Sequence, residues 1–516
     1  MAEYLGRSYD LLSSMSFSAI WMLLEQPYRL QASGFLISYV SVLGIGLIIP
    51  FVEEKIFLNA KADQGRGEKK RKGNYLRDFL ISLRSSLLLF FLTMPLVMRF
   101  YYECSPYSIL LNPFVLACMA PLMISALLAG ILGLFFYSSG IWISSFFFHS
   151  SMFLSVWRLV CLPAVLILRI YHWSFAMVRQ WPGALWITGC LSIASIFVIY
   201  LAEGLFLLFL FWQRTWDGKR RGCTIMVFLC SLLLMGSAFH SLPAFSKSKE
   251  FQITMLDVGQ GDGILLRMPD GKNMLIDGGS TSEEEVWTQT IKPALYYYGI
   301  SYLDYVVITH MDEDHISGIY DMLQSGYPVS QLLTGSYYEG STCLSEDDLS
   351  GIDKIMLNLA RKNGTEIHFL ENGDKLSIGE IRFSCLHPQA YEVYEDRNDK
   401  SLVFYVEYGE FEALFTGDLS QEEENHLLSA INHPIDLLKV GHHGSKYSTG
   451  DALLDHIRPK YAIISAGKNN RYGHPHEELL DRLKKHDVRI YQTMYSGAIC
   501  IQTNGKTSIK IRAFLV

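Results

Sequence analysis

Charged residues are scarce in this chain, at 18% of 516 residues, whereas half of the residues are hydrophobic. An average soluble domain has about 25% charged residues, so the chain as a whole does not have the composition of one. Cysteine occurs nine times but never as Cys-x-x-Cys, which excludes a disulfide framework and a Cys-type zinc site. The net charge of −7 argues against a surface that binds polyanions throughout, and it leaves room only for a local basic patch.

A cleavable signal peptide of the usual layout is also absent at Met1, and the first long apolar run begins near Ser33. The shortage of charge is confined to the residues before about Pro243, and the composition beyond is that of a globular domain. We therefore predict a membrane-embedded helical domain at 1–245 and a globular domain at 246–516, joined by a linker around 246–250.

The apolar runs of the first domain predict membrane-spanning helices of about 20 residues. Residues 11–24 are short for a span and are expected to be interfacial or re-entrant. Residues 141–179 are interrupted by three arginines and are expected to hold one span plus an amphipathic surface helix. The other predicted spans are 33–52, 79–98, 113–137, 184–212 and 223–239.

Two basic loops, at 61–77 and 214–221, set the expected orientation, because loops rich in lysine and arginine stay in the cytoplasm. One span within 141–179 places both loops on the same side. The helix that begins at Cys223 then leaves the cytoplasm, so everything after His240 is expected outside.

The globular domain begins with strands and continues with alternating strands and helices. That order predicts two sheets with helices on the outside. The expected strands are 252–258, 263–268, 273–277, 305–308, 381–386, 402–408, 412–416, 436–440, 461–465, 489–493 and 498–503, and the expected helices are 283–298, 421–430 and 475–485.

The densest group of potential metal ligands lies directly behind the β-branched strand 305–308. Two imidazoles and two carboxylates fall within six residues there: His310, Asp312, Asp314 and His315. Neutral imidazole and ionised carboxylate bind divalent cations, and ligands from one turn hold an ion with little ordering. A single histidine would be read as a solvated loop residue, but H-x-D-x-D-H behind a strand predicts a metal site.

Other carboxylates and imidazoles follow predicted strands in the same way. One such residue is usually a helix cap or a surface residue, but five sites in sequence are hard to explain in that way. Asp277, the first of these residues in the chain, is followed by two glycines, so the backbone can pass close to a ligand there. The residues are Asp277, Asp418, His442, His443, His474 and His476.

From about Phe251 onwards, these ordered motifs resemble the metallo-β-lactamase-fold hydrolases. That superfamily has an αββα sandwich, an H-x-H-x-D-H loop, an earlier strand-end Asp, a later Gly-Asp that bridges two metals, and a terminal His. More narrowly, D-V-G-Q-G-D at 257–262, N-D-K-S-L-V at 398–403, H-H-G-S at 442–445 and Y-G-H-P-H at 472–476 resemble the ComEC family. Members of that family are competence proteins that carry transforming DNA across a bacterial inner membrane.

The first domain agrees with this resemblance, since Y-D-L-L-S-S at 9–14, P-Y at 27–28 and G-F-L-I-S-Y at 34–39 resemble the family's polytopic competence domain. The resemblance implies a polytopic α-helical membrane domain followed by an αββα metallo-β-lactamase-fold domain. It implies a multi-pass protein of the bacterial inner membrane with an extracytoplasmic C-terminal domain. The family's usual chain has an OB-like domain and more helices before this starting point, which predicts an incomplete translocation channel if Met1 is the true start.

The resemblance also implies a binuclear centre with two divalent metal ions, Mn²⁺ or Zn²⁺. His310 and Asp312 would hold one ion, Asp314 and His315 the other, and Asp418 would bridge them. His443 or His442, together with His474, would complete the ligand set or protonate the leaving oxygen. At two positions where the superfamily has a histidine, this chain has Asp312 and Asn398-Asp399. The resulting change from nitrogen to oxygen ligands favours a harder ion such as Mn²⁺. The expected catalytic residues are Asp314, His443 and Asp418.

Three basic residues, Lys446, Lys468 and Arg471, neighbour these motifs and would either meet phosphates or be solvated surface charges. The remaining motif residues are expected to act in substrate binding: Asp257, Gln260, Asp262, Asp277, Asn398 and Ser401.

The favoured interpretation is DNA uptake across the inner membrane, with a metal-dependent nuclease domain that degrades the non-transported strand. Single-stranded or double-stranded DNA, membrane lipid and other competence-machinery proteins are its expected partners. One alternative is a membrane-anchored metallohydrolase that acts on a small ester or lactam. The other is a channel whose C-terminal domain is an inactive binding module. The oxygen-rich ligand set weighs against the first alternative, and intact His310, Asp314, His315 and Asp418 weigh against the second.

Overall fold

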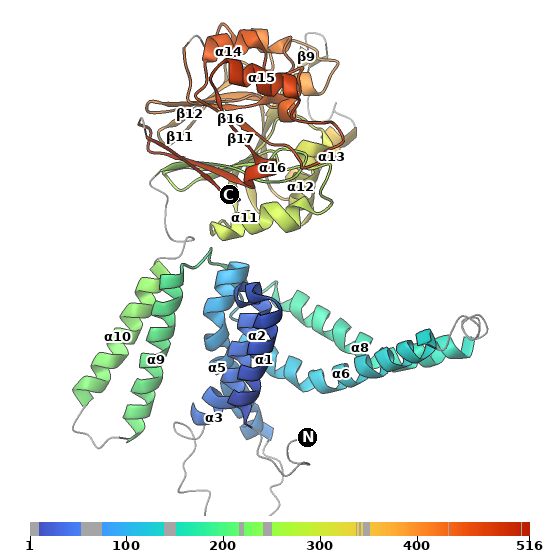
Figure 1. Ribbon diagram of the computed structural model, residues 1–516, viewed down its shortest axis with the longest axis vertical. Coiled ribbons are helices and arrows are strands. Elements are labelled where there is room, and N and C mark those ends of the chain that lie inside the picture. Colours follow the sequence, from blue (N-terminus) through green and yellow to red (C-terminus); the bar gives the residue numbers. More distant parts are fainter. Residues whose placement is uncertain are drawn as a thin grey trace, which may run out of the picture. The chain divides into compact units, whose positions relative to one another are not determined.

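The computed structural model separates into two compact units, 1–242 and 243–516 (Figure 1). It describes residues 10–52, 75–138, 151–215, 221–240, 250–336, 338–339, 342–343, 351–431, 433–506 and 508–515. Most of the basic loop at 61–77, most of the second basic loop at 214–221 and most of the linker at 246–250 lie outside these residues.

The described residues of the first unit include five helical segments that are long and apolar enough to cross a membrane. They are Ser33–Val52, Phe79–Tyr101, Ser108–Ile131, Leu159–Val178 and Ile193–Trp212. These segments include the expected single span within 141–179. Two apolar helices, Leu11–Glu25 and Met226–Ser237, are shorter in the described part of the chain.

The elements of this unit are mostly helices. They are α1 (Leu11–Glu25), η2 (Pro27–Gln31), α2 (Ser33–Leu43), η3 (Gly44–Ile48), α3 (Ile49–Val52), α5 (Tyr75–Tyr101), β1 (Glu103–Cys104), α6 (Ser108–Ser138), α8 (Ser151–Val178), β2 (Trp186–Ile187), α9 (Ile193–Thr215) and α10 (Arg221–His240).

One expected span starts later than predicted. The helix expected at 184–212 begins at Ile193, because Trp186 and Ile187 pair with Cys104 and Glu103 in a short antiparallel sheet. The expected amphipathic helix within 141–179 is not separate in the described part, where Ser151–Val178 is one continuous helix.

The second unit is built on two sheets with helices on their outer faces (Figure 1). The first sheet has the order β10-β7-β6-β5-β4-β3-β18-β19 and the second β11-β12-β13-β14-β15-β16-β17. Helices α11, α12 and α13 cover the first sheet, and α14 and α15 cover the second. This is the layered arrangement that the sequence predicts.

The strands and helices of this unit have the following bounds. The strands are β3 (Phe251–Met255), β4 (Ile264–Arg267), β5 (Asn273–Ile276), β6 (Leu303–Ile308), β7 (Val329–Gly335), β8 (Tyr338–Glu339), β9 (Thr342–Cys343), β10 (Glu366–Leu370), β11 (Lys375–Ile378), β12 (Ile381–His387), β13 (Val403–Tyr408), β14 (Phe411–Phe415), β15 (Leu437–Lys439), β16 (Tyr461–Ile464), β17 (Arg489–Gln492), β18 (Ile499–Thr503) and β19 (Ile509–Ala513). The helices are η6 (Trp287–Ile291), α11 (Lys292–Tyr297), α12 (Glu313–Gln324), α13 (Gly351–Lys362), η7 (Asn398–Lys400), η8 (Glu423–Leu427), η9 (Gly441–Gly444), α14 (Asp451–Ile457), α15 (Glu477–Lys485) and α16 (Thr493–Ser496).

The main apolar core lies between the inner faces of the two sheets. Alternate residues of β3 and β4 meet four buried phenylalanines of the second sheet, as expected for strands that bury one face. A second cluster of leucines and isoleucines fills the space between the second sheet and its helices. The phenylalanines are Phe383, Phe404, Phe411 and Phe415.

Two predicted helices are shorter than expected because polar groups compete for their backbone. The helix expected at 283–298 begins as a π-turn at Trp287, since Ser280 Oγ accepts the N–H groups of Ser282 and Glu283. The helix expected at 421–430 is a 3₁₀ turn in which Glu424 and Leu427, three residues apart, are both buried.

Parallel strands bring the predicted ligands to one edge of the two sheets. In the first sheet β5, β6 and β7 are parallel, and in the second β14, β15 and β16 are parallel. Ligand sites of open α/β sheets form where the carboxyl ends of such strands meet. Asp277, His310, Asp418 and His443 each follow one of these ends.

Candidate metal centre

The loop after β6 leads directly into helix α12, which presents the H-x-D-x-D-H residues. The backbone of Gly279 lies against this turn so closely that a Cβ on it would overlap the backbone of Asp314 and His315. Glycine is therefore required there for the helix to approach the first sheet.

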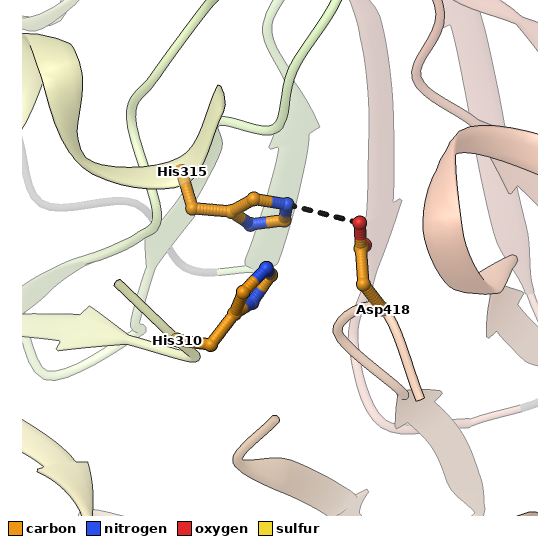
Figure 2. A group of neighbouring side chains, drawn as sticks. All are labelled: His310, His315 and Asp418. Carbon is orange, nitrogen blue, oxygen red and sulfur yellow. Dashed lines mark ion pairs between the residues drawn. The ribbon is translucent and has the colours of Figure 1, made fainter. Parts of the chain in front are cut away.

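Two histidines of this loop converge with Asp418, which comes from the second sheet (Figure 2). His315 Nε2 lies 3.2 Å from Asp418 Oδ2, and the rings of His310 and His315 are 4.0 Å apart between centroids. His310, His315 and Asp418 are all buried. The loop of the first sheet and the β14 end of the second therefore share one centre.

A third histidine joins this group from the turn after β15. His443 Nε2 lies 3.3 Å from Asp314 Oδ2 and 3.4 Å from Asp418 Oδ2. Its Nδ1 faces away from them, towards the Ser465 carbonyl at 3.2 Å and Asp262 Oδ1 at 3.4 Å. Three imidazoles thus present Nε2 to the same space, with Asp418 in the middle.

The orientation of His315 is fixed from behind by a carboxylate. Asp277 Oδ2 lies 2.9 Å from His315 Nδ1, and the same carboxylate accepts the backbone N–H and the hydroxyl of Thr309. Such a contact selects the tautomer that leaves Nε2 free to bind an ion, as is usual for metal-binding histidines.

Backbone strain is concentrated at this edge. Asp277, His442 and His443 have φ angles of 54°, 49° and 53°, a region that L-residues rarely adopt. Strain of this kind persists where the surrounding structure imposes it, often at functional sites. At His442 the imposing contact is a hydrogen bond from its backbone N–H to Asp418 Oδ1, at 3.2 Å.

A buried lysine completes the charge arrangement. Lys439 on β15 is 1% exposed, and its ammonium forms ion pairs with Asp262 and, at 3.4 Å, with Asp418. It also donates to the Gly417 carbonyl at 2.8 Å. Because an unpaired buried charge is strongly unfavourable, Lys439 and Asp262 each depend on the other.

The carboxylates and imidazoles shift one another's proton affinities. Burial disfavours the charged form of His315, but Asp418 and Asp277 outweigh it and hold the pKa of His315 well above its usual range. In the same way Asp418 and Asp262 overcome burial and raise the pKa of His443 to about 10. Burial and the neighbouring His315 hold the pKa of His310 well below its usual range.

These residues fit divalent cations. Within the described part of the chain, Nε2 of His310, His315 and His443 is buried and makes no hydrogen bond. Four sets of three ligand atoms in this region lie within 4.8 Å of one another, and they involve His310, His315, His443, Asp262, Asp277, Asp314 and Asp418. The field that raises the pKa of two histidines also favours a metal ion, which displaces protons from its ligands.

The centre opens into a pocket of about 420 Å³. Arg471 and Tyr472 stand on its wall as a pair, because Arg471 Nη2 donates to the Tyr472 hydroxyl and its guanidinium lies 4.8 Å from the ring centroid. The residues that line the pocket are Gln260, Thr281, Asp312, Glu313, Asp314, Arg397, Asn398, Asp418, His442, His443, Arg471, Tyr472 and His474.

The structure groups the predicted ligands differently from the expected pairs. Asp312 belongs to none of the three-residue groups of possible ligands found among the described residues, and its carboxylate forms an ion pair with Arg397 at 3.3 Å. His315 and Asp314 share their group with His443, while His310 shares one with His315 and Asp418. His442 and His474 line the pocket, and burial with the nearby His442 lowers the pKa of His474 to about 4.

The residues predicted for substrate binding separate into three kinds. Gln260, Asn398 and Arg471 line the pocket. Asp262, Asp277 and Ser401 are at most 1% exposed and lie behind the ligands, so they support the centre rather than face a substrate. Asp257, Lys446 and Lys468 are not among the lining residues, and Lys446 Nζ lies 3.7 Å from Glu478.

Three residues of this site were missed by the sequence analysis. Lys439 carried a signal, a single lysine in the otherwise apolar run of β15. Arg397 stands one residue before the 398–403 motif, and Tyr472 stands inside the 472–476 motif. Neither differs in type from an ordinary surface residue, so the sequence did not single them out.

Two family models match this chain. Residues 1–215 match the "Competence protein" model, and residues 256–468 match the "Metallo-beta-lactamase superfamily" model. The chain therefore combines a competence-protein domain with a metallo-beta-lactamase domain, as the sequence motifs predicted. With its five apolar helices it is a membrane protein, and the second domain supports a metal-dependent hydrolase.

Individual relatives agree with the two family models. The chain is 36% identical to "ComE operon protein 3" of Bacillus subtilis over 49% of this chain and 33% of that protein. It is 32% identical to "Recombination protein 2" of Haemophilus influenzae over 53% of this chain and 32% of that protein. The chain thus spans about a third of the length of these curated relatives.

Among solved structures, CmlA, a diiron beta-hydroxylase from Streptomyces venezuelae, is similar with a TM-score of 0.33 and 14% identity. The similarity covers 52% of this chain and 58% of that one.

Replacing Lys439 by Met should lower the free energy of unfolding of a 248–516 fragment by about 3–5 kcal/mol, because it removes the ammonium that pairs with the buried carboxylate of Asp262. Urea unfolding in the presence of a chelator measures the effect without a compensating metal. The matched control is Lys485→Met, which removes an exposed pair with Asp451 and should cost at most about 1 kcal/mol. Equal effects of the two variants would contradict the assignment of Lys439 as a buried counter-ion.

Proposed function

We propose that the second unit is a metal-dependent deoxyribonuclease and that the whole chain acts in DNA uptake during competence. The observation that carries the proposal is the grouping of three buried imidazoles, whose Nε2 atoms make no hydrogen bond among the described residues, around Asp418 at the base of an open pocket. The match of residues 1–215 to competence proteins supports DNA as the substrate. The hydrolysed strand would be the one that is not transported.

The proposed centre holds two divalent ions. His310, His315, His443, Asp314 and Asp418 would be their ligands, with Asp418 between the two. When bound, such ions polarise a phosphodiester and lower the pKa of a water molecule. Asp277 and Asp262 then keep His315 and His443 oriented.

The pocket wall offers contacts for a nucleic acid. Arg397 and Arg471 present guanidinium groups to phosphate oxygens, a contact that sets affinity without sequence preference. His474 is neutral at pH 7, since its pKa is about 4, so it would accept a proton or bind an ion rather than act as an acid.

The localisation proposed is a multi-pass inner-membrane protein with the second unit outside the cytoplasm. Four of the five apolar segments lie between the two basic loops, so an even number of crossings keeps both loops on one side. Helix α10, with 20 residues, would then cross outwards. Membrane lipid and other proteins of the competence machinery are the proposed partners.

The fragment 248–516 should hydrolyse single-stranded DNA in a metal-dependent reaction. Asp314→Ala and Asp418→Ala should each reduce the rate more than about 100-fold, because each removes a ligand of the proposed centre. The matched control is Asp481→Ala, an exposed carboxylate of α15, which should leave the rate unchanged. The assay is release of labelled nucleotides, with circular dichroism to show that each variant is folded. Full activity of Asp314→Ala and Asp418→Ala would contradict the nuclease assignment. Hydrolysis of an ester or lactam but not of DNA would favour the alternative, a membrane-anchored metallohydrolase for small substrates.

Activity with Mn²⁺ should exceed activity with Zn²⁺ in the metal-free fragment after reconstitution. The reason is the share of carboxylate oxygen in the ligand groups, since oxygen donors favour the harder ion. Asp312→Asn tests whether Asp312 contributes to this preference, and its ion pair with Arg397 predicts that it does not. If Zn²⁺ alone restores full activity and Mn²⁺ restores none, the assignment of a hard ion is wrong.

A reporter placed after Val516 should read out as extracytoplasmic. An alkaline-phosphatase fusion there should be active, and a fusion in the loop near Lys219 should be inactive, because that loop is basic. Protease added to intact spheroplasts should digest the second unit. Protection of that unit, together with an inactive fusion at Val516, would place it in the cytoplasm.

A further inference from the structure

A second group of ligating side chains lies outside the pocket, between the segment after β12 and the 3₁₀ turn η8. Atoms of Glu392, Glu423 and His426 lie within 4.8 Å of one another. His426 Nε2 is 3.7 Å from Glu423 Oε2. None of these residues lines the pocket of the candidate metal centre.

A buried histidine points into this group. His387 is fully buried, and its Nδ1 lies 2.9 Å from the carbonyl oxygen of Ser401. A carbonyl only accepts, so Nδ1 must carry the hydrogen. With the ring hydrogen on Nδ1, the lone pair of the imidazole lies on Nε2.

That lone pair faces another acceptor. His387 Nε2 is 3.7 Å from Glu423 Oε2, and among the described residues neither atom has a hydrogen-bond partner. This separation is too long for a direct hydrogen bond. Two unpartnered acceptors that face each other in a buried position are unfavourable, and a cation between them would remove the repulsion.

The spacing suits a transition-metal ion. Metal–ligand bonds of about 2.1 Å at tetrahedral angles place donor atoms roughly 3.4 Å apart. Glu423 Oε2 is 3.7 Å from an imidazole nitrogen of both His387 and His426, so an ion bound by this carboxylate lies next to both rings. Glu392 supplies a further carboxylate, whose Oε2 accepts a hydrogen bond from the Tyr394 hydroxyl at 2.7 Å.

We propose that His387, Glu392, Glu423 and His426 form a separate, mononuclear site for a divalent transition-metal ion such as Zn²⁺. Two imidazoles and two carboxylates are a donor set that such ions accept. The contact from His387 Nδ1 to a carbonyl oxygen is the orienting contact that metal-binding histidines usually have.

This site is connected to the candidate metal centre through Ser401. The Ser401 carbonyl accepts from His387, while its hydroxyl accepts the backbone N–H of Asp418 at 2.9 Å and lies 3.4 Å from His310 Nδ1. An ion that fixes His387 therefore also fixes the support of Asp418 and His310. The ion has a positioning role and does not touch the substrate.

The test counts metal ions on the full-length chain in detergent after dialysis against Zn²⁺, by mass spectrometry of metal and protein. His426→Gln and Glu423→Gln should each bind about one ion fewer per chain than the unaltered protein. The matched control is His368→Gln, which replaces a partly exposed histidine that lies 3.4 Å from Glu366 on β10, and its metal count should not change. His387→Gln should also bind one ion fewer. Because His387 is buried, this variant could fail to fold, and in that case His426→Gln and Glu423→Gln decide the outcome.

Equal metal counts in His426→Gln, Glu423→Gln and the unaltered chain would overturn the proposal. The count does not depend on catalysis, so a chain without nuclease activity that still loses one ion in these variants supports this site and contradicts only the proposed function. A loss of the same size in His368→Gln would show adventitious binding at surface histidines and would also overturn it.

Discussion

The burial of several carboxylates around one lysine is the constraint on which the second unit depends. Asp262 and Asp418 are almost completely buried, and Lys439 is the ammonium ion that faces both. Isolated buried carboxylates would be strongly unfavourable, so this pair allows the two sheets to close over them. Asp277 and Asp314 add negative charge beyond what one lysine balances. The remaining negative field is what makes the space between the histidines suitable for cations.

The topology explains why residues so far apart in sequence share this field. Parallel strands in both sheets end at the same edge, and the turns after β5, β6, β14 and β15 carry the possible ligands. The first sheet supplies His310 and His315, and the second supplies Asp418 and His443. The apolar core between the sheets fixes the distance across which these groups meet. The ligand geometry is thus a property of sheet packing rather than of any one loop.

The sequence predicted the parts of this arrangement that repeat a simple pattern. Apolar runs followed by His or Asp identified the strand ends, and therefore His310, His315, Asp418 and His443, because strand and ligand are adjacent in the chain. Pairing within the H-x-D-x-D-H loop was less accurate. Helix α12 begins at Glu313, so Asp312 becomes its N-terminal flank and turns to Arg397 instead of joining His310.

Other features depend on contacts between segments that the sequence does not connect. A lysine in strand β15 was not distinguished from a solvent-facing one, since its partners Asp262 and Asp418 come from other strands. The motif residues Asp262, Asp277 and Ser401 were assigned to substrate, because a motif does not tell whether a residue faces the pocket or supports those that do. Glu424 is buried in the second unit, and its inward turn replaced an expected helix with a 3₁₀ turn.

The distribution of ligands along the chain also governs when the centre can form. His310 and His315 are synthesised about a hundred residues before Asp418, and the pocket wall is completed only by His474. Two strands near the C-terminus, β18 and β19, then close the first sheet beside β3. A partly made or truncated chain therefore lacks the ligands from the second sheet and cannot assemble the centre. Because of this strand order, the ligand set is complete only when the whole unit has folded.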